Sequence, residues 1–212
     1  MQKADALAVI LAAEQPPNLP LPPALLEYEG GRSLLEEVAA ACRKGGLGRV
    51  TVVLGQHADE VAARHPELAT VRDGAGTGLR AGLLEALSAE DVQEIVVLPV
   101  EHAALRPSTV ATLLKASRGA HGAVPEFEGA LGRPVLLSRA GAEAVLSDGA
   151  TGLEQALSVL QLERIKVRDP GVVVAFREPQ LFERILGSAP HAAPPRKRGG
   201  KKKPNGGAGD ET

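Results

Sequence analysis

The sequence predicts an α/β domain with a mostly parallel central sheet that helices cover on both faces, in three layers. Strand-like segments alternate with amphipathic segments from residue 7 to residue 118, which is the order of a doubly wound sheet. The first strand segment, 7–13, is apolar throughout. Such a run is typical of a central parallel strand that is buried on both faces.

Length and composition agree with one domain of this kind. Of the 212 residues, 44% are hydrophobic and 24% are charged, which argues against gross disorder and against a membrane bundle. Aromatic residues make up only 2%, so neither base stacking nor sequence-specific nucleic-acid binding is expected. The lone Cys42 excludes an intrachain disulfide and fits a cytoplasmic location. The short apolar stretch after Lys3 is interpreted as a strand rather than a signal peptide.

The first half of the chain contains a helix with a clear beginning and end. Between residues 32 and 44, apolar side chains recur at the spacing of one helical face. Ser33 is placed as the N-cap, and Gly45 and Gly46 as the end. The other elements predicted in this half are strands at 50–54, 68–72 and 94–98, and helices at 57–65, 79–88 and 107–115.

The second half is less regular, and its end loses all periodicity. From residue 187 onward Pro, Gly, Ala and Lys dominate, so the prediction is a domain over 1–187 and a disordered basic tail over 188–212. The tail could contact polyanions or stay solvated. Within the domain, strands are predicted at 121–125, 133–137, 163–168 and 172–176, and helices at 139–146, 152–160 and 179–186.

The loops that follow the predicted parallel strands are the place to expect a ligand, because open α/β sheets bind ligands beyond the carboxyl ends of these strands. They are 14–31, 55–57, 73–78 and 99–106. The first is much longer than the 2–6 residues usual for such a connection. A functional loop and a proline-stiffened surface loop both account for that length.

Six segments, taken in order, form a recognisable set of motifs. They are Leu11-Ala12-Ala13 with Gly31-Arg32-Ser33-Leu34-Leu35, Val52-Val53-Leu54-Gly55, Thr77-Gly78-Leu79-Arg80-Ala81-Gly82-Leu83, Leu98-Pro99-Val100-Glu101-His102, Gly129-x-x-Gly132-Arg133-Pro134, and Asp169-Pro170-Gly171. This set resembles the MobA-like nucleotidyltransferases over residues 5–187. The resemblance implies a Rossmann-like sheet of the nucleotide-diphospho-sugar transferase, or GT-A, type.

The resemblance also implies a reaction. A phosphate of an acceptor, either a phosphorylated cofactor precursor or a sugar phosphate, attacks the α-phosphate of a nucleoside triphosphate, and pyrophosphate leaves. Mg²⁺ is the implied cofactor, and Glu101 stands at the position of the metal-binding carboxylate, where it is expected to be an exposed cleft side chain. The residues at nucleotide-binding positions are Leu11, Ala12, Ala13, Gly55, Thr77 and Gly78.

The loop that should surround the phosphates departs from the family pattern L-A-A-G-x-S-x-R-M-G-x-P-K. Glu14 stands at its first loop glycine, Asn18 at its arginine and Pro23 at its lysine. Ala175 and Arg177 stand at the two acidic positions of the closing motif. No catalytic residue is therefore assigned, and these losses favour a weakened or inactive member of the family.

Two other interpretations stay open. A non-catalytic scaffold would keep the sheet and bind a nucleotide or a partner through its cleft or basic tail. An unrelated Rossmann-like domain is disfavoured, because no G-x-G-x-x-G follows any predicted strand. His102 is expected to pack within its loop rather than to bind a metal, and His57 and His65 are expected to be solvated.

Overall fold

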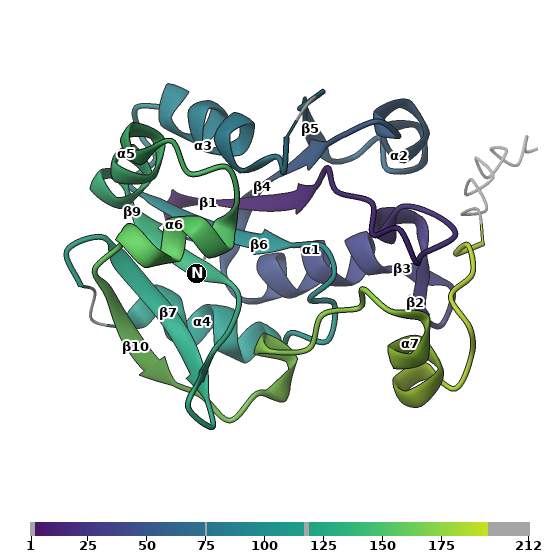
Figure 1. The fold of residues 1–212 in the computed structure, drawn as a ribbon. Helices are drawn as coiled ribbons and strands as arrows, with labels where there is room; N and C mark the ends of the chain where they lie inside the picture. Colours follow the sequence, from purple (N-terminus) through teal and green to yellow (C-terminus); the bar gives the residue numbers. More distant parts are fainter. Residues whose placement is uncertain (1–2, 75, 117–118, 195–212) are drawn as a thin grey trace, which may run out of the picture.

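The computed structural model describes residues 3–74, 76–116 and 119–194, and within them a central sheet dominates (Figure 1). The sheet contains β1 (Lys3–Ala12), β4 (Leu47–Leu54), β5 (Ala69–Arg72), β6 (Glu94–Pro99), β7 (Gly122–Phe127), β8 (Ala130–Leu131), β9 (Val135–Ser138) and β10 (Leu162–Lys166). Its order is β10-β7-β9-β6-β1-β4-β5, with β8 beside β7. The neighbours of β1 run parallel to it, and β9 is antiparallel to both β6 and β7.

Helices cover both faces of this sheet. One face carries α1 (Leu34–Lys44), α2 (Ala58–Arg64) and α4 (Pro107–Lys115), and the other carries α3 (Leu79–Ser88), α5 (Arg139–Asp148) and α6 (Leu153–Val159). The last helix, α7 (Pro179–Leu186), lies beside β2 (Glu27–Glu29) (Figure 1) and joins the core of the first face through Phe182. The predicted three-layer α/β architecture is confirmed. The remaining elements are η1 (Pro23–Leu25), β3 (Arg32–Ser33) and η2 (Pro170–Val172).

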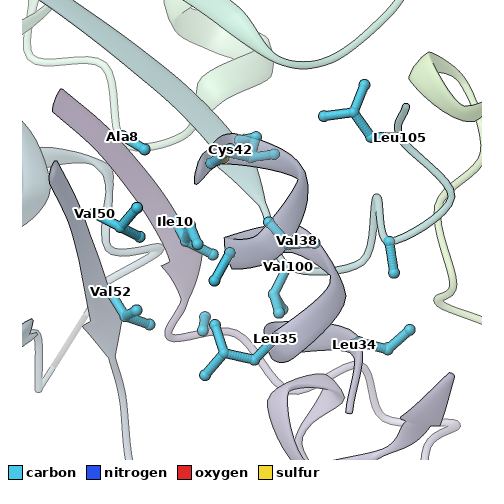
Figure 2. Packing of buried hydrophobic residues seen from close by; sticks show 14 of the residues in the cluster. Ala8, Ile10, Leu34, Leu35, Val38, Cys42, Val50, Val52, Val100 and Leu105 are labelled. Carbon is cyan, nitrogen blue, oxygen red and sulfur yellow. The ribbon is translucent and has the colours of Figure 1, made fainter. Parts of the chain in front are cut away.

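The apolar run of β1 forms the three layers because its side chains alternate between two cores. Ala8 and Ile10 face the core under α1 and α4, and Figure 2 shows Ile10 near Val38 of α1. Val9 faces the second core, under α3 and α5. A strand that is buried on both faces needs apolar residues at every position, which is the pattern of 7–13.

The beginning of α1 follows from two side chains. The Ser33 hydroxyl accepts a hydrogen bond from the Glu36 N–H at 3.2 Å, and the Glu36 carboxylate accepts one from the Ser33 N–H at 2.7 Å. This capping box satisfies two amides at the helix terminus. At the other end, a Cβ on Gly45 would lie 2.5 Å from the Cβ of Val110, so α4 can approach α1 closely only at a glycine.

The strand predicted over 172–176 is absent. This stretch instead begins at the last residue of η2. Its backbone makes single hydrogen bonds to other segments rather than a strand ladder: the Val172 carbonyl accepts from the Arg133 N–H at 2.7 Å, and the Phe176 N–H donates to the Glu101 carbonyl at 2.9 Å. The Asp169 side chain accepts from the Gly171 N–H at 2.9 Å, which turns the chain at the start of the segment. Apolar composition alone did not reveal that turn.

The packed part of the chain extends beyond the predicted boundary at residue 187. The Glu27 N–H donates to the His191 carbonyl at 2.8 Å, the Ala193 N–H donates to the Leu25 carbonyl at 3.0 Å, and Ala193 is buried. Backbone groups make this pairing, so side-chain periodicity could not predict it. The rest of the predicted tail, 195–212, lies outside the described residues. Among those described, none of the helices has the length and apolarity needed to cross a membrane.

Candidate functional site

A cleft of about 450 Å³ opens at the carboxyl ends of β1 and β6, where the sheet order predicts a ligand. Its walls come from the loops after these two strands, from the turn between β8 and β9, from the start of α6 and from the segment after η2. The lining residues are Leu11, Glu14, Thr77, Pro99, Glu101, His102, Ala130, Leu131, Gly132, Arg133, Gly152, Leu153, Glu154, Val172, Val173, Ala175 and Arg177.

The residues implied to bind nucleotide lie at this same edge but divide between two hollows. Leu11 and Thr77 line the cleft, whereas Ala13 and Gly55 line a neighbouring hollow of about 330 Å³. A Cβ on Gly55 would collide with the Ala13 carbonyl oxygen. The close approach of these two loops therefore requires a glycine. The Ala12 side chain packs into the core under α1, which leaves only its backbone to face a ligand.

Polar groups at the N-terminus of α3 already form hydrogen bonds within the chain. Gly78 has φ = 85°, a conformation that favours glycine, and its N–H donates to the Asp73 carboxylate at 2.9 Å. The Thr77 hydroxyl donates to the Thr151 carbonyl. Sequence reasoning missed Asp73, although its place at the end of β5 and five residues before Gly78 was a usable signal.

Three side chains far apart in the sequence meet at the mouth of the cleft. Nη2 of Arg177 donates to Oε2 of Glu14 at 2.9 Å, and Nε of Arg177 lies 3.8 Å from Oε1 of Glu101. Beside them, Nδ2 of Asn18 donates to both carboxylate oxygens of Glu178, at 3.0 and 3.2 Å. We call Glu14, Arg177 and Glu101 the charge cluster. Two of the positions at which the loop departs from the family pattern, Glu14 and Asn18, are thus bound to the closing segment.

Another departure, Pro23 at the position of the lysine, lies elsewhere. It opens η1 and is buried, so it does not line the cleft. Proline at this position has neither the charge of a lysine nor an amide N–H.

Glu101 is buried, contrary to the expectation of an exposed cleft carboxylate. It is 3% exposed. Burial raises the pKa of Glu101 above its ordinary value, and the Arg177 guanidinium opposes that rise. Its position after β6 was predicted. The segment after η2 packs against it through the Phe176 N–H and the Arg177 guanidinium, and the sequence pattern wrongly indicated this segment as a strand.

His102 is a buried neutral imidazole at the wall of the cleft. Burial, together with the positive charge of Arg133, lowers the pKa of His102 to about 4. Its Nδ1 atom has no hydrogen-bond partner within the described part of the chain. His65, which was expected to be solvated, is also buried and lies 3.5 Å from the Ser33 hydroxyl. Only His57 of the predicted solvated pair has an exposed side chain.

The His102 imidazole makes folding sensitive to acid. Its pKa of about 4 lies below the ordinary 6.5, so the unfolded chain binds the proton more readily. The free energy of unfolding therefore has its full value with respect to this group above pH 6.5. It decreases as the pH falls towards 4, by about 3 kcal/mol in total. We expect His102→Gln to flatten the urea-unfolding stability profile across this window, and His57→Gln to leave it unchanged. Equal acid sensitivity in the wild type and in His102→Gln would contradict this assignment.

The acidic residues present do not fit a divalent metal ion. In the described ranges, no three His, Cys, Asp or Glu side chains come close enough to hold one. Mg²⁺ requires near-octahedral oxygen coordination, whereas the two carboxylates of the charge cluster both face a guanidinium. These carboxylates are therefore engaged with a cation of the chain itself.

Several solved structures share this fold. The Rv0371c homolog from Mycobacterium sp. strain JC1 is 27% identical, with a TM-score of 0.74 over 86% of this chain and 96% of that one. Rv0371C from Mycobacterium tuberculosis H37Rv, in complex with manganese, is 18% identical, with a TM-score of 0.70 over 88% and 100%. A nucleotidyl transferase from Methanothermobacter thermautotroptrophicus is 19% identical, with a TM-score of 0.71 over 86% and 96%.

A family comparison gives the most specific result. No curated protein matches the chain. Residues 8–166, more than half of the chain, match the MobA-like NTP transferase domain. The matched region includes the loops after β1, β4 and β6 that form the cleft and the neighbouring hollow. The chain therefore belongs to the MobA-like NTP transferase domain family.

Proposed function

We propose that this protein binds a nucleoside triphosphate at the carboxyl edge of its sheet and that its nucleotidyl-transfer chemistry is lost or strongly weakened. The family reaction joins a nucleotidyl group to a phosphorylated acceptor and releases pyrophosphate. Family membership and the likeness to a nucleotidyl transferase support the view that the cleft corresponds to the site of this reaction in the family. The departures at the mouth of the cleft support its loss.

The charge cluster is the observation that carries the proposal. Transfer of a nucleotidyl group needs positive charge placed against the phosphate oxygens in the transition state. Here the loop after β1 brings a carboxylate, Glu14, and the nearby cation Arg177 is already bonded to it. Removal of one preorganised donor typically costs ~10²–10³ in rate. The loss of both the arginine and the lysine of the loop should cost more.

Metal dependence is where this chain differs from its family, whose members commonly need a divalent metal. The family position for Mg²⁺ is Glu101, and this carboxylate is buried beside Arg177. A single carboxylate that already faces a cation is a poor Mg²⁺ ligand. Nucleotide binding should therefore be largely independent of Mg²⁺.

The nucleotide contacts that remain are mainly backbone groups. Ala13 and Gly55 border the smaller hollow, and Leu11 and Thr77 border the larger cleft. A base and ribose can be held there by shape and by backbone hydrogen bonds without any catalytic side chain. Polyanion contacts of the basic tail and a cytoplasmic location stay predictions.

A non-catalytic scaffold that binds a partner is the second candidate. The Asp73 carboxylate favours it, because it accepts from the Gly78 N–H that a phosphate would need at the N-terminus of α3. Negative charge at this position also repels a triphosphate.

Calorimetric titration of the full-length protein with ATP, GTP, CTP and UTP separates the two candidates. We expect saturable binding of at least one triphosphate, with and without Mg²⁺. Asp73→Asn should tighten binding by up to about tenfold, or ~1.4 kcal/mol, because it removes the competing charge. Asp91→Asn is the matched control, since Asp91 pairs with Arg49 on an exposed surface. Absence of binding in both the wild type and Asp73→Asn would favour the scaffold.

A further inference from the structure

The two carboxylates of the charge cluster come from different parts of the fold. Glu14 follows β1 and its side chain is 41% exposed, whereas Glu101 follows β6 and its side chain is 4% exposed. Both carboxylates face Arg177, one through a hydrogen bond and the other through an ion pair. A single cation therefore lies against both acids.

Arg177 is held in place from its own segment as well as by the acids. Its neighbour Phe176 is fully buried, and the Phe176 N–H donates to the carbonyl of Glu101 at 2.9 Å. This backbone bond fixes the segment directly against the residue whose carboxylate the guanidinium faces. The next residue, Glu178, accepts two hydrogen bonds from Asn18 of the first loop. The position of the guanidinium is thus set by contacts on both sides.

Burial makes the cation necessary. A carboxylate as enclosed as Glu101 is costly in its charged form unless a positive group lies nearby. In the described part of the chain, Arg177 is the cation that makes an ion pair with Glu101. A divalent ion would meet the same need, but it cannot share the position between the two acids with a guanidinium.

We propose that Arg177 is an internal substitute for a divalent cation: its guanidinium takes the place between Glu14 and Glu101 and keeps metal ions out of the cleft. Arginine suits this role because its charge persists at every physiological pH and its planar fork contacts two carboxylates at once. Removal of the positive charge should therefore unmask a divalent-cation site. This inference deepens the proposed metal independence, and its test uses no nucleotide.

The test is a titration of the full-length protein with Mn²⁺ alone, in which free Mn²⁺ is followed by electron paramagnetic resonance. The wild type and Arg177→Lys, which keeps the charge, should bind no Mn²⁺ at the cleft. Arg177→Gln should gain a weak site, and Arg177→Asp, which supplies a third carboxylate, should bind about tenfold tighter than Arg177→Gln. Adding Glu101→Gln to Arg177→Asp should abolish the new site.

Circular dichroism and the melting temperature confirm that each variant is folded, and Mn²⁺ should raise the melting temperature of Arg177→Asp but not that of Arg177→Lys. Arg49→Gln is the matched control, because Arg49 forms a 2.7 Å ion pair with Asp91 away from the cleft. Mn²⁺ binding by the wild type that requires Glu101, or folded Arg177→Gln and Arg177→Asp proteins with no gain, would overturn the proposal. A failure of nucleotide binding leaves these metal outcomes unaffected, so the two proposals fail separately.

Discussion

Replacement of Phe176 by alanine is expected to lower the free energy of unfolding by about 3–5 kcal/mol. The Phe176 side chain is fully buried, and its ring meets Tyr28 at 5.5 Å and Phe182 at 5.0 Å between centroids, both edge to face. The substitution removes the middle ring of three and leaves a cavity between η2, α7 and the first loop. Urea unfolding followed by circular dichroism measures the loss.

Phe127→Ala is the matched control for this substitution. Phe127 is only partly buried at the end of β7 and lies in no ring contact within the described ranges, so its loss should be clearly smaller. Equal losses for the two variants would show that the aromatic cluster has no special role in holding the segment that carries Arg177.

Replacement of Asp169 by alanine is the second large effect, with an expected loss of about 3–5 kcal/mol. The Asp169 carboxylate is 3% exposed and accepts from the Thr109 hydroxyl at 2.7 Å, from the Arg106 N–H at 2.9 Å and from the Gly171 N–H at 2.9 Å. Alanine leaves these donors without an acceptor, and the bonds from Thr109 and Gly171 are buried. The measurement is again urea unfolding at neutral pH.

Two further variants make the Asp169 result specific. Asp169→Asn keeps the shape and part of the acceptor capacity, so it should lose less than alanine. Asp91→Ala removes an exposed partner of Arg49 and should change stability by less than about 1 kcal/mol. A loss for Asp169→Ala no larger than that for Asp91→Ala would contradict the role assigned to the buried carboxylate.

The sequence was sufficient for the layers and for most helix boundaries because these depend on local signals. The apolar run in β1 required two cores, and Ser33 with Glu36 set the start of α1. The same local signals failed where distant contacts decide the structure. Residues 172–176 have strand-like composition, but the Asp169 turn and the burial of Phe176 determine their path.

The candidate site was predictable in position but not in electrostatics. The sheet rule placed Glu14, Thr77 and Glu101 at one edge, as the structure does. The pairing of Glu14 with Arg177 joins residues separated by 163 positions, which no local pattern reveals. The burial of Glu101 depends on that same distant segment. Sequence reasoning therefore recognised that cations were missing from the loop, but not that an internal cation lies against the two acids.

Pyrophosphate release is the most direct measure of whether the cleft retains transfer chemistry. The full-length wild type is incubated with Mg²⁺, each of the four nucleoside triphosphates and a panel of sugar phosphates and phosphorylated cofactor precursors. We expect release no faster than in protein-free controls, because the loop after β1 has no cation of its own and Arg177 is paired with Glu14. Turnover of ~1 s⁻¹, the lower end of typical enzyme rates, with a nucleotidyl product identified by mass spectrometry, would contradict the proposed loss of catalysis.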